Sequence, residues 1–258
     1  METSAQLEDS LDELEEDLRS GEIVLGELGH LKFPFHEMGT INSTHLFGLH
    51  ELILFSFYWR NRNRYKRVAD LGANLGLHSL ILELIGLPTW SYEPDPEHYR
   101  ILVENLTANS VFRGQAIQKA VATSTTSHEF IRVLGNTTGS HLAGAKTNPY
   151  GPIEAFSVEA EDVREVIANV DLVKMDVEGL EADLLETMSI EDFRRVDILA
   201  EVGTEANATR IWDQIIQLRD VQVFTQKRNW ERALSPEDLP HSHRDGSIFV
   251  SSKKTMPW

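Results

Sequence analysis

Short apolar segments alternate with segments of helical periodicity from Arg67 onward, and this alternation constrains the fold more than any other feature. The expected strands occupy residues 68–71, 89–92, 116–121, 172–175 and 198–202, and the expected helices occupy residues 77–85, 96–109, 181–188 and 208–218. Strands that alternate with helices in this way form parallel sheets with helices on both faces. The sequence therefore predicts an α/β fold.

An insertion interrupts the alternation before the fourth strand. Residues 127–134 and 153–158 predict a β-hairpin, joined by a long loop rich in Gly, Thr and Asn. A loop of that length is usually functional or mobile. Two more strands are expected at residues 221–225 and 247–251, around the polar segment 229–245.

An extension precedes the alternating pattern. Four leucines in it recur at helical spacing among acidic residues: Leu7, Leu11, Leu14 and Leu18. This amphipathic helix either packs on its own domain as a lid or forms a seam in a homodimer. A small hairpin over residues 21–35 and a helix over residues 45–59 follow. We expect residues 1–60 to pack on a core domain formed by residues 61–258.

Composition excludes several classes of protein. The chain has 258 residues and no cysteine, which excludes a thiol nucleophile, Cys-ligated metal and a disulfide framework. Its formal net charge of -17 disfavours nucleic acid and anionic membranes as partners. Neither a signal peptide nor an apolar run of the ~20 residues that a spanning helix needs is seen, so we expect a cytoplasmic protein without a membrane anchor.

A glycine turn joins the first expected strand to the first expected helix. Gly72 and Gly76 lie where the backbone must turn tightly or approach a ligand. Asp70 at the strand end would repel a dinucleotide pyrophosphate but attract an ammonium or sulfonium group. The third glycine of a G-x-G-x-x-G motif is missing, because Leu77 stands there, which weakens the nicotinamide interpretation. Alternatively, the glycines serve strand-helix packing alone, which the presence of Asn74 disfavours.

A second acidic strand end follows at Glu93, in the run Tyr-Glu-Pro-Asp from Tyr92 to Asp95. A carboxylate about 20 residues after the glycine turn is placed to accept hydrogen bonds from ribose hydroxyls. The alternative, an acid in a solvated turn or at a helix start, fits Asp95 better than Glu93.

Together with the run from Asp171 to Gly179, these motifs resemble the FkbM-like S-adenosylmethionine-dependent methyltransferases over residues 51–202. The resemblance implies a Rossmann-like class I methyltransferase fold, with a seven-stranded sheet whose last strand is antiparallel. It also implies O-methylation of a hydroxyl on a small molecule, sugar or natural product. The methionine half of the cofactor would lie at the glycine turn, formed by Asp70, Gly72, Ala73, Asn74 and Gly76. Glu93 would hold the ribose, and the adenine would lie near Ala120 and Val121.

The fourth strand ends in a second acidic motif, which contains Asp176 and Glu178. Methyl transfer is an in-line displacement, so the enzyme must align an oxygen nucleophile and, where needed, remove its proton. Asp176 is the first candidate base or orienting group and also borders the cofactor, with Glu201 on the next strand as its analogue. These two carboxylates either raise one another's pKa or share a divalent cation such as magnesium. Glu178 is either catalytic or a helix first-turn acid, and Glu181 fits the first-turn role better.

The sequence thus predicts an S-adenosylmethionine-dependent O-methyltransferase. A nicotinamide-nucleotide-dependent oxidoreductase and a catalytically silent cofactor-binding protein are the alternatives. The pair His241 and His243 precedes the last strand and is either a metal or base site or, as we favour, a solvated loop.

Overall fold

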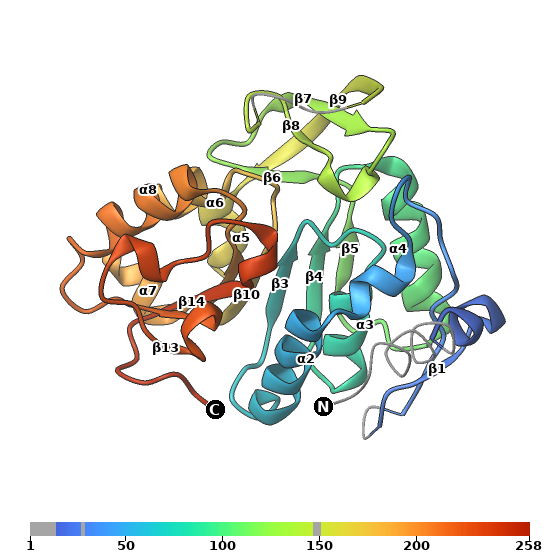
Figure 1. Cartoon of the computed structure of the whole chain (residues 1–258), viewed down its shortest axis with the longest axis horizontal. Coiled ribbons are helices and arrows are strands. Elements are labelled where there is room, and N and C mark those ends of the chain that lie inside the picture. Colours follow the sequence, from blue (N-terminus) through green and yellow to red (C-terminus); the bar gives the residue numbers. More distant parts are fainter. Residues whose placement is uncertain (1–13, 27–28, 147–150) are drawn as a thin grey trace.

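The centre of the structure, a computed structural model that describes residues 14–26, 29–146 and 151–258, is an eight-stranded sheet (Figure 1). The strand order is β13, β12, β14, β11, β10, β3, β4, β5. The strands are β3 (Val68–Leu71), β4 (Thr89–Tyr92), β5 (Gln115–Ile117), β10 (Leu172–Met175), β11 (Asp197–Glu201), β12 (Gln222–Thr225), β13 (Glu231–Arg232) and β14 (Ser247–Ser251).

The register of the parallel strands brings their carboxyl ends to one edge of the sheet. β10 lies parallel to β3 and to β11, and β3 lies parallel to β4. Lys174 pairs with Asp70 and with Leu199 across these ladders, so all three side chains point to the same face. β14 runs antiparallel to both β11 and β12. Residues that follow β3, β4 and β10 therefore gather at that edge.

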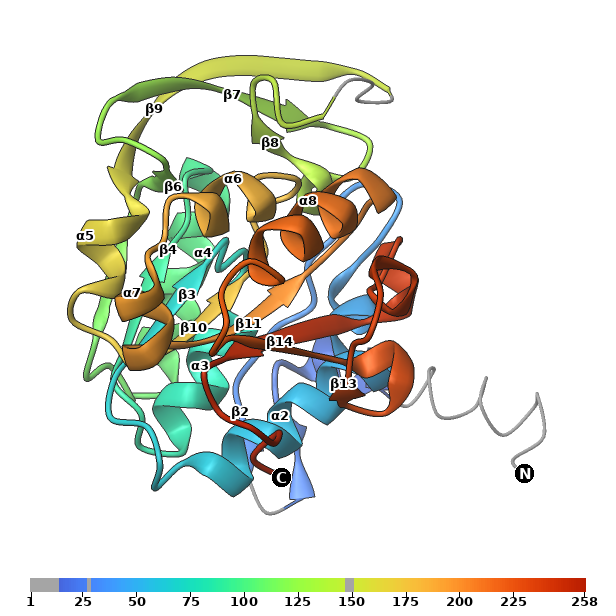
Figure 2. The same ribbon diagram turned by 90° about the vertical axis from the view of Figure 1, so that its left-hand side faces the viewer.

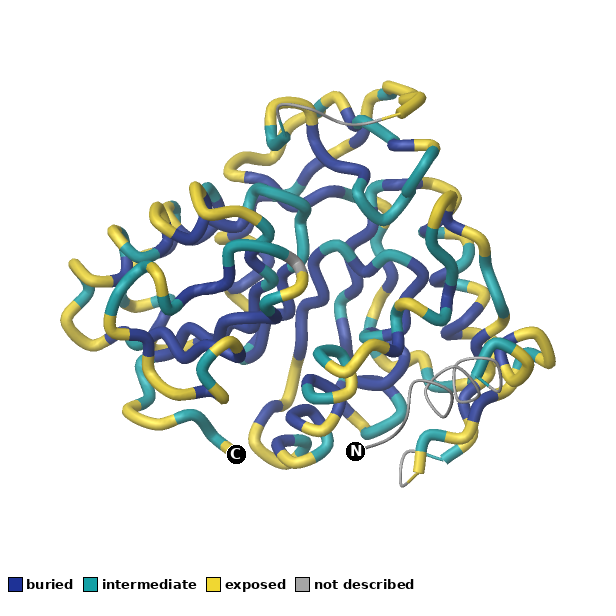
Figure 3. The backbone as a smooth tube through the Cα atoms, in the orientation of Figure 1, coloured by how far each residue is buried: buried dark blue, intermediate teal, exposed yellow. Residues whose placement is uncertain are grey.

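Helices cover both faces of the sheet (Figure 2). On one face, Ala69 and Val173 pack in a cluster with α5 (Val163–Ile167), α6 (Glu181–Glu186), α7 (Ile190–Arg195) and α8 (Glu205–Ile215). On the other, Val68 and Leu172 pack with α2 (Leu49–Asn61), α3 (Leu77–Leu84) and α4 (Pro96–Ala108). Burial on both sides explains why these strands are mostly apolar, and they form the dark core of Figure 3.

None of the helices in the described ranges is long and apolar enough to cross a membrane.

A second sheet of four strands, in the order β6, β9, β7, β8, lies across the carboxyl edge of the central sheet (Figure 1). It comprises β6 (Ala120–Ala122), β7 (Ser127–Val133), β8 (His141–Leu142) and β9 (Ile153–Asp162). β7 and β9 pair antiparallel from Ser127 and Glu159 to Val133 and Ile153. The inserted segment is thus part of a four-stranded sheet and not an isolated two-stranded hairpin, because β8 and β6 pair with its two sides.

The N-terminal extension packs on the helical face of α2, α3 and α4. Residues 14–20 are helical, and β1 (Ile23–Val24) pairs antiparallel with β2 (His30–Leu31). Leu18 and Phe33 are fully buried in the same apolar cluster as α2. Leu7 and Leu11 of the expected amphipathic helix lie outside the described residues, and Leu14 is partly buried against the cluster.

The sheet differs from the expected seven strands by β13. Thr225, the last residue of β12, is followed by η4 (Gln226–Arg228), and Asn229 and Trp230 both adopt positive φ (55° and 63°). This tight reversal allows the polar residues Glu231 and Arg232 to pair with the end of β12. Because both residues are polar, the sequence pattern did not predict this strand, which lies at the edge of the sheet with exposed side chains.

The expected third strand, residues 116–121, is two strands in different sheets. β5 ends at Ile117, whose carbonyl accepts hydrogen bonds from the N–H groups of Glu93 and Lys119. That turn sends the chain into β6, which pairs with β9 and not with the central sheet. The short helices α5 and α7 were not expected, because five or six residues are too few to display a helical period.

Candidate active site

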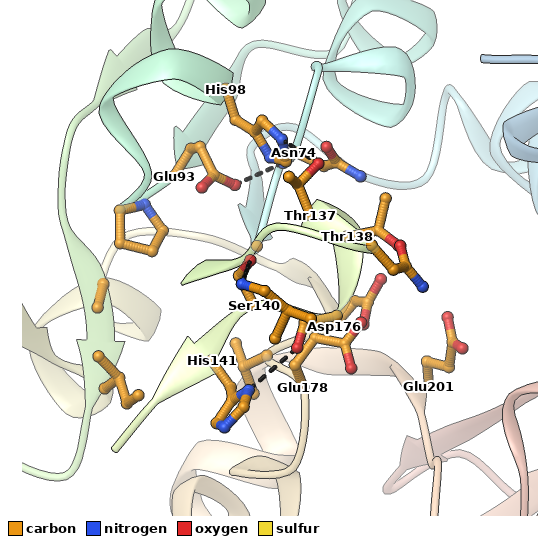
Figure 4. Close-up of a pocket in the computed structure, with 18 of the residues that line it drawn as sticks. Asn74, Glu93, His98, Thr137, Thr138, Ser140, His141, Asp176, Glu178 and Glu201 are labelled. Carbon is orange, nitrogen blue, oxygen red and sulfur yellow. Dashed lines mark hydrogen bonds between the residues drawn. The ribbon is translucent and has the colours of Figure 1, made fainter. Parts of the chain in front are cut away.

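A cavity of about 680 Å³ lies between the carboxyl edge of the central sheet and the four-stranded sheet. Strand-end residues form its floor, the β7–β8 region forms its roof, and the segment around η2 (Ser43–Phe47) and α2 forms one side. Eight of the residues predicted from the sequence line it: Gly72, Asn74, Glu93, Ala120, Val121, Asp176, Glu178 and Glu201. Most of these are drawn in Figure 4.

Gly72 allows the turn after β3 to lie against the end of β10. Its φ is +76°, and a Cβ atom there would lie 1.8 Å from the carbonyl oxygen of Asp176. The N–H groups of Gly72 and Ala73 both donate to the carbonyl of Tyr92, at 3.0 and 2.9 Å. Three strand ends are therefore held together at this residue. Asp176 and Gly72 both line the cavity where these strand ends meet.

Three residues predicted to contact the cofactor lie behind the cavity wall instead of lining it. Asp70 is fully buried, and its Oδ2 atom accepts a 2.6 Å hydrogen bond from Ser79. Ala73 is buried, and Gly76 caps α3 where a Cβ would meet Leu102 of α4. These residues shape the turn from beneath, because the side chains of a strand end and a helix start point into the core.

Glu93 is a buried carboxyl group that fixes the glycine turn. Its Oε2 accepts from the N–H of Asn74 at 2.7 Å, and its Oε1 accepts from the N–H of Asp95 at 2.8 Å. Burial raises the pKa of Glu93 to about 8, although both hydrogen bonds favour the ionised form. Beside it, the buried Oδ1 atom of Asn74 accepts no hydrogen bond from any residue that the structure describes. Both side chains face the same part of the cavity (Figure 4).

Lys174 is a buried cation that the sequence analysis did not single out. Its Nζ lies 3.3 Å from Oδ2 of Asp176 and 3.9 Å from Oδ1 of Asp70. Burial alone would lower the pKa of Lys174, but nearby carboxylates raise it above its ordinary value. They are Asp176, Asp70, Glu51 and Glu201. In the sequence, this role is indicated only by the position of the lysine, which lies between apolar residues in an expected strand. A charged side chain is rarely fully buried unless it is paired.

Glu51 and His78 extend this polar group along the same face. Glu51, on α2, lines the cavity, and its Oε2 lies 2.8 Å from Nε2 of His78 on α3. Nδ1 of His78 lies 3.0 Å from the hydroxyl of the buried Tyr58. Burial would raise the pKa of Glu51, but the hydrogen bond and charge of His78, followed by Lys174, lower it. The helix over residues 45–59 was expected, but its contribution to the site was not.

Glu178 and Glu181 have different environments. Glu178, with a φ of 54°, lines the cavity and forms an ion pair with Lys146 of the inserted segment. Glu181, the first residue of α6, points inward and accepts from the N–H groups of Val177 and Gly179. Burial raises the pKa of Glu181 to about 7. Glu181 thus holds the turn that carries Glu178.

The two possible metal sites considered from the sequence are the acidic strand ends and the pair His241 and His243. Within residues 14–26, 29–146 and 151–258, no group of three or more His, Asp or Glu residues has the arrangement of a metal site. Nε2 of His241 lies 3.3 Å from the carbonyl oxygen of Pro236. The side chain of His243 lies outside the described part of the chain.

The comparison with family models agrees with the fold. The model of the methyltransferase FkbM domain matches residues 70–228, more than half of the chain. The chain therefore belongs to the FkbM methyltransferase family. The match includes the glycine turn, Glu93, Asp176 and Glu201, whereas Glu51 lies before it.

Solved structures with a similar arrangement are distant in sequence. Cofactor-bound Rv0187 from MTB is 10% identical, with a TM-score of 0.45, covering 78% of this chain and 79% of that one. The ribosomal protein L11 methylase from Lactobacillus delbrueckii subsp. bulgaricus is 12% identical, with a TM-score of 0.41 and coverages of 79% and 78%. WbdD is 15% identical, with a TM-score of 0.40, covering 79% of this chain and 39% of that one. No curated protein shows significant similarity to the chain.

Proposed function

We propose that this protein transfers a methyl group from S-adenosylmethionine to a hydroxyl of a small molecule, sugar or natural product. Family membership supports methyl transfer in general. The single observation that carries the choice of cofactor is the pairing of Glu93 with the glycine turn at the floor of the cavity.

The residues present fit this cofactor. The unpartnered Oδ1 of Asn74 is an acceptor suited to the ammonium or a hydroxyl of the ligand, and an orphaned buried acceptor is costly without one. Each carboxylate oxygen of Glu93 accepts one backbone hydrogen bond and keeps capacity for a ribose hydroxyl. Ala120 and Val121 line the cavity with small apolar surface for the adenine. A volume of about 680 Å³ falls in the ordinary range for ligand pockets.

Asp176 is the residue that we propose to act on the acceptor. S-adenosylmethionine, when bound, supplies an electrophilic methyl group on a sulfonium. Asp176 lies in the cavity at the end of β10, and its carboxylate can accept the proton of an acceptor hydroxyl or hold that hydroxyl in line. Glu201, at the end of the neighbouring β11, lines the same region and is the second candidate.

Titration calorimetry with S-adenosylhomocysteine tests the cofactor assignment. We expect micromolar binding, and we expect Glu93→Ala to weaken it about 10- to 100-fold, since the hydrogen bonds from the ribose hydroxyls are lost and the glycine turn loses its acceptor. Glu104→Ala is the matched control, because Glu104 is exposed on α4 and pairs with Arg100. Binding of NADH without binding of S-adenosylhomocysteine would contradict the proposal and favour an oxidoreductase.

A screen for methyl transfer tests the reaction. Hydroxylated sugars and natural products are incubated with cofactor labelled in its methyl group, with and without magnesium. With an acceptor found, Asp176→Asn should lower turnover while S-adenosylhomocysteine binds as before. Unchanged turnover would remove Asp176 from the mechanism.

A further inference from the structure

The acidic edge of the sheet poses an electrostatic problem that the cavity must solve. Glu51, Asp176 and Glu201 all line it, and Asp70 lies directly behind. Carboxylates that gather at one site repel, and without a counter-charge this repulsion favours the protonated form of one of them. A protonated Asp176 could not accept a proton from an acceptor hydroxyl. From the sequence, either this outcome or a shared divalent cation was expected.

We propose that the ammonium of Lys174 is the built-in counter-ion of this carboxylate cluster and acts as a positioning residue that keeps Asp176 charged and correctly oriented. The inference rests on the proposed function, because it gives Asp176 the role stated there. Its basis is geometric: Nζ lies 3.3 Å from Asp176 and 3.9 Å from Asp70.

The register of the sheet explains why this cation can serve both acids. Lys174 is directly opposite Asp70 on the adjacent parallel strand, so their side chains share the face covered by α2 and α3. Asp176 is two residues farther along, where side chains again point to that face. The long lysine side chain therefore reaches from the buried ladder to Asp176, which lines the cavity, and only 9% of the lysine side chain is exposed.

The four carboxylates around the ammonium come from four different elements. Asp70 belongs to β3, Asp176 follows β10, Glu201 ends β11 and Glu51 belongs to α2. Asp70 is further held by Ser79 of α3. His78 of α3 pairs with Glu51 and so supplies a second source of positive charge or hydrogen bonding on that side. Two other lysines line the cavity, but their described ion pairs are not with the carboxylates around Lys174. Lys146 pairs with Glu178, and Lys119 pairs with Glu161.

Removing the ammonium should lead the carboxylate cluster to take up a proton. Comparing a charged ligand with an uncharged one should then detect that proton. Without Lys174 the cluster holds a proton at neutral pH, and a sulfonium placed beside it expels that proton. S-adenosylhomocysteine is uncharged at the same sulfur and does not. The difference in protons released between the two ligands therefore reports the protonation of the cluster, independently of any methyl acceptor.

The experiment is titration calorimetry of the full chain with S-adenosylmethionine and with S-adenosylhomocysteine, each at pH 7 in two buffers of different ionisation enthalpy. In the wild type we expect no difference in proton release between the ligands. Lys174→Met should release up to about one additional proton with S-adenosylmethionine. Lys174→Arg, which keeps the charge, should behave as the wild type does.

Two further variants control for loss of packing. Lys174→Met combined with Asp176→Asn removes one cation and one anion together, and the additional proton should disappear. Lys253→Met removes a different lysine, which pairs with the buried Asp197 at the opposite end of β11, and should leave proton release unchanged.

The outcomes separate the inference from the proposed function. A wild type that binds neither ligand overturns the proposed function. A wild type that binds both but releases a proton only with S-adenosylmethionine, and whose Glu93→Gln variant does so equally, overturns the role of Lys174 alone, even where Lys174→Met does not fold. A folded Lys174→Met with the proton release of the wild type overturns it equally.

Discussion

Arg132 and Asp95 form a bidentate ion pair that joins the four-stranded sheet to the turn holding Glu93. Nε and Nη2 of Arg132 donate to the two carboxylate oxygens of Asp95, both at 2.6 Å. Burial would raise the pKa of Asp95, but Arg132 holds it below its ordinary value. Asp95 also caps α4, and its own N–H donates to Glu93. The roof and the floor of the cavity are therefore coupled through one side chain of β7.

Arg132→Met should destabilise the protein and weaken S-adenosylhomocysteine binding. Only 13% of the Arg132 side chain and 1% of Asp95 are exposed, so the substitution leaves a buried carboxylate without its partner. Loss of one member of a buried pair costs about 3 kcal/mol. Urea denaturation measures this loss in the free energy of unfolding, and calorimetry measures the affinity.

Arg210→Met is the matched control for Arg132. Arg210 also bonds two carboxylates, Asp183 and Glu186, but it is 42% exposed. Exposed pairs contribute less than about 1 kcal/mol. If both arginine variants lost the same stability, with ligand binding intact in each, the proposed coupling between roof and floor would be wrong.

Glu93 should make the protein less stable as the pH rises toward 8. The pKa of its carboxyl group is raised to about 8 in the folded chain from an ordinary 4.5. Through this carboxyl group the folded state binds more protons than the unfolded state between these values, so the contribution of Glu93 to stability is greatest below pH 4.5 and falls as pH rises. The slope for one such group approaches about 1.4 kcal/mol per pH unit. Glu181, with a pKa raised to about 7, adds to the slope with the same sign.

Urea denaturation at several pH values between 5 and 8 measures this effect. Glu93→Gln cannot ionise, and its unfolding free energy should depend less on pH than that of the wild type. Glu181→Gln should remove the remaining part of the slope below pH 7. Parallel curves for the wild type and Glu93→Gln would show that Glu93 ionises normally in the folded chain.

The strand ends could be predicted from the sequence because their signals are local. The bounds of β3, β4, β10 and β14 follow directly from short apolar runs, and Glu93 and Asp176 follow from their places after two of those runs. Such runs indicate buried strands wherever their flanks signal turns.

The side chains that support the site depend on tertiary pairing and were not predictable in the same way. Arg132 and Asp95 are 37 positions apart, and their pairing requires that the inserted segment fold back over the cavity. Lys174 meets Asp70 only through the register of β10 and β3. Asp70 illustrates the reverse case, because its position at the strand end was correct but its side chain points into the core.

Tyr58→Phe should cost less stability than Tyr65→Phe. The hydroxyl of Tyr58 pairs with the ring of His78 at 3.0 Å, whereas that of Tyr65 donates to the buried carboxylate of Asp197 at 2.8 Å. A neutral hydrogen bond contributes about 1 kcal/mol and one to a charged group about 2 kcal/mol. Both rings remain buried in the same apolar cluster, so the comparison isolates the hydroxyl. Urea denaturation of the two variants measures the difference, and a larger loss for Tyr58→Phe would contradict the expected order.

Gly72→Ala should abolish S-adenosylhomocysteine binding. Two effects act against alanine there, the strain of a positive φ and the collision of its Cβ atom with Asp176, and Gly86→Ala introduces only the first. Both glycines have positive φ, +76° and +92°, so alanine at either position pays a backbone penalty of about 1 kcal/mol. At Gly86 no heavy atom of the described chain lies within 4 Å of the added Cβ, whereas at Gly72 the carbonyl oxygen of Asp176 lies 1.8 Å away. The backbone of β10 cannot move aside without breaking the hydrogen bond from the N–H of Asp176 to Leu71. Gly72→Ala should therefore lose several-fold more unfolding free energy than Gly86→Ala, together with ligand binding. Equal losses with binding retained in both would show that the contact between the glycine turn and Asp176 is not needed for the site.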